Sequence, residues 1–108
     1  EKKEINLYEL KVADAKKLNH YLEPIEGGGM VQVIGDSTII TRLSLEQIAY
    51  HLEKKYKTFF SYNGNDTGKY SFTYKNVATI EEMEKQLFEL TGIKFEKEMA
   101  IKEFITIQ

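Results

Sequence analysis

The side chains best suited to acid–base or metal chemistry are few and far apart in this sequence. His20 and His51 are the only histidines, and the chain contains no cysteine. A histidine base needs a nucleophile and an orienting carboxylate close by, and a zinc site needs several ligands at a suitable spacing. Neither histidine has such neighbours, and His51 falls on the polar face of a predicted helix. The sequence therefore predicts a protein that is not an enzyme, with no catalytic residue, no metal site and no cofactor.

Oxygen-bearing side chains gather in one loop, Asn63–Gly68. Asn63, Asn65 and Asp66 offer oxygen ligands to calcium, but a calcium loop uses several acidic ligands and a closing bidentate glutamate. A single acid among turn-forming residues favours a plain turn. The second glycine-containing loop, Gly27–Gly29, has neither a following helix nor a Lys-Ser/Thr pair, so a phosphate-binding loop is not expected there.

Tyrosines around the Asn63–Gly68 loop carry the clearest binding signal. Tyrosine suits recognition surfaces because one end of its ring is apolar and the other is polar. We therefore define a candidate interaction surface, for a protein or a glycan, of Tyr62, Asn63, Asn65, Asp66, Lys69, Tyr70 and Tyr74. The same alternation also fits Tyr70, Phe72 and Tyr74 as core residues that face the helices.

Two segments, Leu45–Tyr56 and Ile80–Leu90, are predicted to be amphipathic helices. In each of them apolar residues recur at helical spacing and charged residues occupy the opposite side. Ser44 and Thr79 precede them, each followed three residues later by Gln or Glu, which is a capping-box pattern. Gly92 stands where a left-handed residue ends many helices.

The rest of the chain is mostly predicted strand. Gly35-Asp36-Ser37 is the predicted turn of a tight hairpin, and a second turn is predicted near Met99-Ala100. Ala13–Ile25 fits either a short helix capped by Asp14 or an irregular segment. The predicted strands are Ile5–Val12, Met30–Ile34, Thr38–Leu43, Thr58–Tyr62, Lys69–Lys75, Ile93–Glu98 and Ile101–Ile107.

The two capped helices also suggest an internal repeat. Aligning Ser44 with Thr79 places Phe60 opposite Phe95, although two amphipathic helices can also look alike by chance. Each helix has one charged side and so buries only the other, which favours a two-layer α+β domain with a mainly antiparallel sheet and both helices on one face. The predicted single domain, 1–108, comprises an N-terminal strand and loop 1–29, repeat unit one 30–62 and repeat unit two 69–107.

Composition narrows the classes of protein further. The 108 residues are 42% hydrophobic, and 15 basic residues nearly balance 17 acidic ones to give a net charge of −2. Disorder needs lower hydrophobicity and less balanced charge, and a nucleic-acid-binding domain usually carries a basic excess. No apolar run is long enough to cross a bilayer. We expect no nucleic-acid partner and no membrane insertion, and the polar start Glu1-Lys2-Lys3-Glu4 suggests a mature protein or an excised domain.

Five stretches follow, in order, the motifs of one known family. Gly68–Phe72 resembles the signature T-G-x-x-G-x-Y-D-F, with Ser71 in place of its Asp. The other four are Leu7–Ala13, Ser44–Leu52, Leu87–Glu96 and Ile101–Ile107. The family is a bacterial envelope-associated one of unknown function, an acidobacterial paralogous set whose C-terminal half this chain resembles. Its members are often fused behind thioredoxin-like reductase or sensor-peptidase modules, so the resemblance implies an exported, periplasmic or envelope-associated accessory domain.

A second, weaker resemblance is to the short N-terminal domains of secretins and TonB-dependent receptors, which share the order of elements and the Phe60-Ser61-Tyr62 stretch. Those domains bind protein partners, often through a sheet edge. Two functions therefore remain open. One is a non-catalytic interaction module that accepts a partner strand along Ile5–Val12 or Ile101–Ile107, or a partner on the aromatic surface. The other is a regulatory or positioning domain of an enzyme upstream in the same polypeptide.

Overall fold

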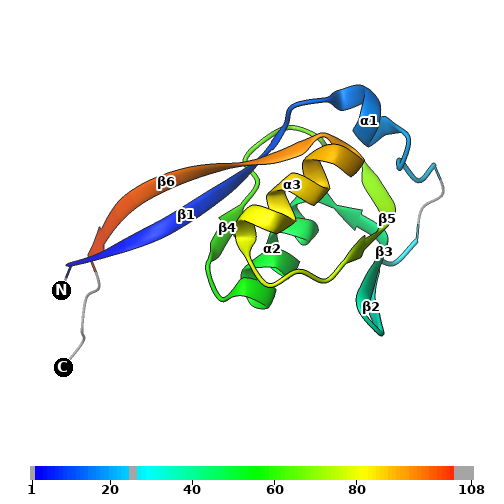
Figure 1. Cartoon of the computed structure of the whole chain (residues 1–108). Helices are drawn as coiled ribbons and strands as arrows, with labels where there is room; N and C mark the ends of the chain where they lie inside the picture. Colours follow the sequence, from blue (N-terminus) through cyan, green and yellow to red (C-terminus); the bar gives the residue numbers. More distant parts are fainter. Residues whose placement is uncertain (1, 25–26, 104–108) are drawn as a thin grey trace.

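The described residues, 2–24 and 27–103 of the computed structural model, form an α+β fold of three helices and six strands (Figure 1). The predicted α+β class is confirmed, and the internal repeat stays a prediction. The elements in chain order are β1 (Lys2–Val12), α1 (Ala15–Asn19), β2 (Met30–Ile34), β3 (Ser37–Ser44), α2 (Leu45–Tyr56), β4 (Phe59–Ser61), β5 (Lys69–Lys75), α3 (Ile80–Thr91) and β6 (Ile93–Glu103).

The strands form two three-stranded sheets in place of the single sheet predicted. β1 lies at the centre of one sheet, parallel to β4 and antiparallel to β6. β3 lies at the centre of the other, antiparallel to both β2 and β5. The prediction of one sheet was wrong because apolar alternation marks which residues share a face of a strand but not which strands pair. Each of the two predicted repeat units contributes strands to both sheets.

β6 is a single continuous strand, Ile93–Glu103. The turn predicted near Met99-Ala100 is wrong, because both residues continue the antiparallel pairing with β1 without a break in register. The later part of the predicted strand Ile101–Ile107, residues 104–107, lies outside the described residues. Figure 1 shows β1 and β6 as a two-stranded ribbon that extends away from the helices.

The two long helices begin and end where local chemistry predicts. At the start of α2, Ser44 Oγ accepts a hydrogen bond from the Gln47 amide at 3.2 Å, and the Gln47 side chain accepts one from the Ser44 amide at 2.9 Å. Thr79 Oγ1 accepts from the amide three residues on in α3. Both helices end on a left-handed residue, Lys57 after α2 and Gly92 after α3. The predicted capping box is confirmed at α2. At α3 the predicted caps Thr79 and Gly92 are confirmed, but the box is incomplete, because the Glu82 carboxylate accepts from the Thr79 hydroxyl at 3.1 Å and not from its amide.

Residues 13–24 of the predicted segment Ala13–Ile25 are described, Ile25 lies outside the described residues, and only the first part of 13–24 is helical. Asp14 Oδ1 accepts hydrogen bonds from two amides of the short helix α1, and Leu18 from this helix is buried. The chain then runs beside β5, where the Tyr21 carbonyl accepts a hydrogen bond and the Glu23 amide donates one. Both interpretations of this segment therefore hold over part of its length.

The core is one continuous apolar cluster, and α2 contacts strands of both sheets. Tyr8 from β1 stacks on Phe60 from β4 with ring centroids 5.1 Å apart, and Phe95 from β6 meets Phe60 edge-on at 5.3 Å. Aromatic pairs in these geometries add about 0.5–1.5 kcal/mol to the area they bury. All three rings belong to the β4-β1-β6 sheet, so the aromatic cluster fastens the strands of this sheet to one another.

Candidate interaction surface

The predicted site residues of the Asn63–Gly68 loop bond chiefly to one another. Tyr62 is half-buried, and its hydroxyl accepts a hydrogen bond from the Asp66 amide at 3.0 Å. Asp66 Oδ1 accepts from the Gly68 amide at 2.7 Å, and Asp66 Oδ2 accepts from the Tyr70 hydroxyl at 2.5 Å. Both carboxylate oxygens of Asp66 are therefore engaged, one by the loop and the other by Tyr70 of β5, which makes this acid a turn-forming group.

The remaining predicted residues divide between the surface and the core. Asn63 and Asn65 are exposed, and the Asn63 amide donates to Glu9 of β1 at 3.1 Å. Lys69 points to another part of the molecule, where its ammonium donates to the Gly27 carbonyl at 3.2 Å. Tyr74 is only 2% exposed.

Tyr70 is equally part of the core, at 4% exposed, as is Phe72 between Tyr70 and Tyr74 on β5. The alternative interpretation, in which these rings face the helices, fits the structure. Two of the three tyrosines proposed for an aromatic surface are therefore unavailable as surface rings, because alternation along β5 points them into the core.

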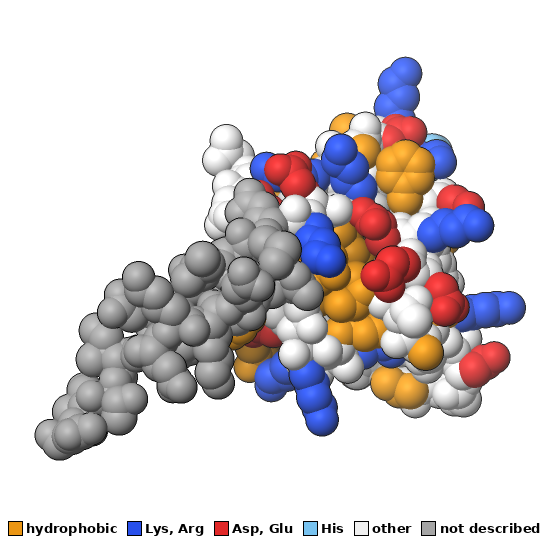
Figure 2. Space-filling view, turned by 60° about the vertical axis from the view of Figure 1, so that its left-hand side comes forward, with side chains coloured by type: hydrophobic (Ala, Val, Ile, Leu, Met, Phe, Trp, Pro, Cys, Tyr) orange, Lys and Arg blue, Asp and Glu red, His pale blue; other side chains and the backbone are white. Residues whose placement is uncertain are grey.

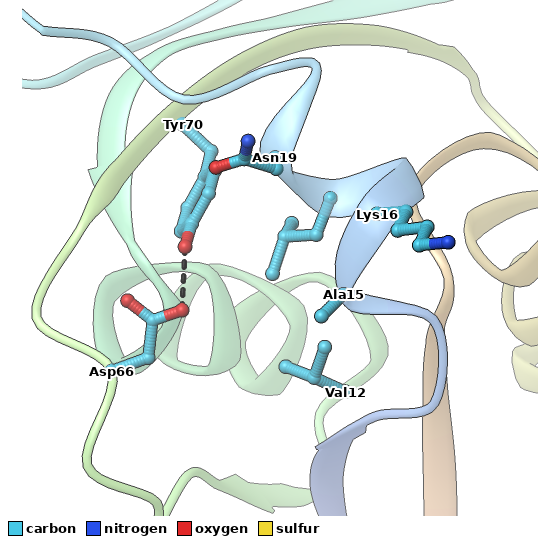
Figure 3. Close-up of a pocket in the computed structure, with 7 residues that line it drawn as sticks. Val12, Ala15, Lys16, Asn19, Asp66 and Tyr70 are labelled. Atoms are coloured by element: carbon cyan, nitrogen blue, oxygen red, sulfur yellow. Dashed lines mark hydrogen bonds between the residues drawn. The ribbon is translucent and has the colours of Figure 1, made fainter.

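A cavity of about 300 Å³ lies between the loop and α1 (Figure 3), lined by Val12, Ala15, Lys16, Leu18, Asn19, Asp66 and Tyr70. Burial and the hydrogen bond to Asp66 raise the pKa of Tyr70 above its ordinary value, so its hydroxyl remains a donor to the carboxylate. The Lys16 ammonium points away from Asp66 in Figure 3. Among the described residues that line it, the cavity thus offers no charged group free to meet a ligand.

A polar cluster, missed in the sequence, joins α2 to the β2-β3-β5 sheet. His51 Nε2 lies 2.6 Å from the hydroxyl of Tyr74. The hydroxyl of the buried Thr38 donates to Asn76 Oδ1 at 2.5 Å, and the Lys55 ammonium donates to the same oxygen at 2.9 Å. These bonds join residues from α2, β3 and the region of β5, which are far apart in the sequence, so no local sequence pattern predicts them.

The charge states of this cluster follow from its burial. Burial, and to a lesser extent the neighbouring Lys55 ammonium, lower the pKa of His51. Burial raises the pKa of Tyr74, although a bond with Thr38 opposes this. Neutral His51, in the tautomer that leaves Nε2 unprotonated, can then accept a hydrogen bond from the Tyr74 hydroxyl, so the half-buried histidine satisfies a core hydroxyl. His20 is exposed.

Three of the sheet-edge strands have side chains bound to their backbone. Gln86 from α3 both accepts from the amide and donates to the carbonyl of the last residue of β5, at 2.8 and 2.9 Å. Glu84 accepts from the Phe95 amide of β6 at 2.8 Å. Glu53 accepts from the Phe60 amide of β4 at 3.3 Å. Such covering removes backbone groups that another strand would bind.

β2 is the exception among the described edge strands. Its sequence, Met-Val-Gln-Val-Ile, has neither a charge nor a proline, which are the usual means of protecting an edge. Met30, Val31, Val33 and Ile34 are 53%, 38%, 65% and 54% exposed. β2 pairs with β3 on one side, no strand of the described chain pairs with it on the other, and the hairpin projects from the body in Figure 1.

The turn between β2 and β3 fixes which backbone groups face outward. Gly35 has a positive φ of 60° and Asp36 does not have a positive φ, which is the pattern of a type II′ turn. Ile34 and Ser37 are therefore the hydrogen-bonded pair that closes this two-residue turn. In an antiparallel ladder hydrogen-bonded and non-bonded pairs alternate. The N–H and C=O groups of Val31 and Val33 therefore point away from β3 toward solvent.

The edge strands named in the sequence prediction differ from this one. Ile5–Val12 belongs to β1, which lies inside its sheet where Leu7–Glu9 pairs with β4, so this part of the prediction is wrong. Residues 101–103 belong to β6, an edge strand as predicted. An uncharged apolar run such as Met30–Ile34 usually indicates a buried strand, which is why its exposure could not be predicted from the sequence.

The charged side chains on the face drawn in Figure 2 are mixed in sign, with Lys and Arg beside Asp and Glu around scattered apolar groups. This face therefore lacks the one-sign field that steers a highly charged partner. Within residues 2–24 and 27–103, no helix has the length and apolar character needed to span a bilayer.

Comparisons with protein-family models, with curated proteins and with solved structures give no match to this chain. The resemblance to the envelope-associated family stays a prediction. The function is accordingly inferred from the geometry of the described residues.

Proposed function

We propose that this domain is a non-catalytic protein-interaction module that binds an extended segment of a protein along β2. The observation that supports the proposal is the uncovered, uncharged and exposed edge of this strand. A partner strand added there would bond to the outward N–H and C=O groups of Val31 and Val33. Main-chain hydrogen bonds of this kind give affinity for any extended segment, and the side chains of β2 determine which segments bind best.

The side chains of β2 favour an apolar partner. Val31 and Val33 share one face of the strand, and Met30, Gln32 and Ile34 share the other, so apolar groups line both faces. Cross-strand pairs of β-branched residues are favourable, whereas a charged side chain opposite Val33 would lose hydration without a counter-charge. The preferred partner segment is therefore extended, uncharged and rich in β-branched residues.

A location in the bacterial envelope is part of this proposal and rests on the family resemblance. The same resemblance supports the alternative of a positioning domain for a thioredoxin-like or peptidase module in the same polypeptide. Binding along β2 would serve either arrangement, because strand addition requires only an accessible edge and an extended partner.

A synthetic peptide tests the binding mode. The probe alternates valine and threonine and carries a lysine at each end for solubility. We expect it to shift the amide resonances of Val31 and Val33 and slow their hydrogen exchange. Val33→Lys should abolish this effect, whereas Thr73→Lys, at an exposed position of β5 already paired with β3, should leave it unchanged. Peptide binding that leaves the β2 amides unaffected would overturn the proposal.

A further inference from the structure

We propose that β2 also binds a second copy of this chain, strand to strand and antiparallel, about a two-fold axis through Gln32. This inference rests on the proposed function and names one partner for the same edge. It follows from the way the exposed strand complements itself in hydrogen bonds, in side chains and in charge.

The hydrogen-bond register agrees with this axis. An antiparallel pair centred on Gln32 places Val31 of each copy opposite Val33 of the other. These are the two residues whose N–H and C=O groups point away from β3. Each Val31–Val33 pair can then form two hydrogen bonds, and Gln32 faces its own equivalent across a non-bonded pair. This register uses all five residues of β2.

The side chains also match across the axis. Met30 of one copy lies opposite Ile34 of the other, and no charged residue of β2 meets a like charge. A slip of two residues toward the turn would shorten the pairing and set Asp36 opposite Met30. The net charge of −2 also opposes association only weakly.

The assembly closes at two copies. A two-fold interface uses the same patch on both partners and leaves no complementary surface for a third. β5, at the far edge of each sheet, has Gln86 and the Tyr21–Glu23 segment bound to its backbone. Five residues a side cover much less than the ~800 Å² per partner of a stable interface, so the dimer should be weak and depend on concentration.

Charge placed on the axis tests the symmetry directly. In sedimentation velocity over a range of concentrations up to millimolar, the wild-type chain should pass from monomer to dimer. Gln32→Glu alone and Gln32→Lys alone each set like charges opposite one another, and each should weaken dimerisation about fivefold. An equimolar mixture should restore it, because opposite charges then meet. Phe88→Lys, at an exposed apolar position on α3, is the matched control and should dimerise like wild type.

A cysteine cross-link provides a second readout, because the natural chain has no cysteine. Directly opposite non-bonded residues have Cα atoms about 4.5 Å apart, within the range that a disulfide bridges. Gln32→Cys should therefore form a disulfide dimer rapidly with copper phenanthroline as oxidant. Val33→Cys should do so slowly, because each copy then presents its cysteine opposite Val31 of the other.

The results separate this inference from the proposed function. A chain that stays monomeric up to millimolar concentration, or a dimer that does not respond to the Gln32 charges, overturns self-pairing. If the valine–threonine peptide still protects Val31 and Val33 in that case, the edge is a binding site for other proteins. Circular dichroism of each variant verifies its fold, and Gln32 is exposed, so its replacement should leave the fold intact.

Discussion

Replacing Gly92 with alanine perturbs a junction of three elements. Gly92 ends α3 with φ 74° and ψ 12°, and its amide donates to the Phe88 carbonyl at 3.0 Å. Its carbonyl accepts from the amides of Ala13 and Asp14, at 2.8 and 3.1 Å, and so holds the β1–α1 connection beside the start of β6. A Cβ at this position would collide with the Asp14 carbonyl oxygen.

Two costs add in Gly92→Ala. An L-residue in the left-handed conformation costs about 1–2 kcal/mol. Relief of the collision requires the Asp14 backbone to move, which disturbs two hydrogen bonds worth about 0.5–1.5 kcal/mol each. We therefore expect a loss of about 2–5 kcal/mol in the free energy of unfolding. This is a large share of the ~5–15 kcal/mol typical of a folded domain.

Two other glycines separate these costs. Gly35 also has a positive φ, of 60°, but no atom lies within 4 Å of a Cβ built there. Gly35→Ala should therefore show the conformational cost alone, about 1–2 kcal/mol. Gly28 has no left-handed φ, and no atom lies within 4 Å of a Cβ built there. Gly28→Ala should therefore be neutral or stabilising by less than ~1 kcal/mol.

Urea unfolding followed by circular dichroism gives the three free energies. Gly92→Ala should exceed Gly35→Ala by the hydrogen-bond contribution, about 1–3 kcal/mol. Equal costs at the two positions would refute the reasoning, because the packing of Gly92 against Asp14 would then contribute nothing to stability.

Three further predictions concern stability. Burial lowers the pKa of His51 in the folded state below its ordinary 6.5, so protonation of this histidine favours the unfolded state. The free energy of unfolding is therefore unaffected by protonation of His51 above pH 6.5 and decreases as the pH falls through the folded-state pKa. Thermal unfolding from pH 8 to 5 should show that this decrease is smaller in His51→Gln and retained in His20→Gln. Lys57→Gly should raise the free energy of unfolding in urea by about 0.5–1 kcal/mol, because Lys57 has φ 53°. Gln86→Ala should lower that free energy by about 1–2 kcal/mol and speed hydrogen exchange at the Lys75 amide, whose partner it removes; an unchanged exchange rate would contradict this role.

The sequence predicted the long helices well because their signals are local. The capping residues Ser44 and Thr79 lie within four residues of the amides they satisfy, and an apolar stripe repeats within each helix. The same holds for the tight turn at Gly35, where one residue type permits the backbone conformation. Such features depend on neighbours in the chain, so they can be read without the tertiary structure.

The pairing of strands and the candidate site could not be predicted in this way. The division into two sheets depends on which strands lie side by side across the chain, and the His51–Tyr74 bond joins α2 to β5. The edge of β2 is exposed because no other described segment packs against it, and this depends on the arrangement of the whole fold. Tyr70 and Tyr74 are of a residue type that is common on recognition surfaces, but the packing of their sheet buries both of them.

The pairing of β1 with β6 also sets an order for folding. These strands come first and last among the elements and pair along eleven residues each. Contacts so distant in sequence close slowly, because the loop-closure entropy is lost before the pairing is gained. The β2-β3 hairpin closes on a two-residue turn and can form within microseconds. During synthesis, the exposed edge of β2 would therefore exist before β1 has met its partner, and nascent chains of this protein should need protection from one another.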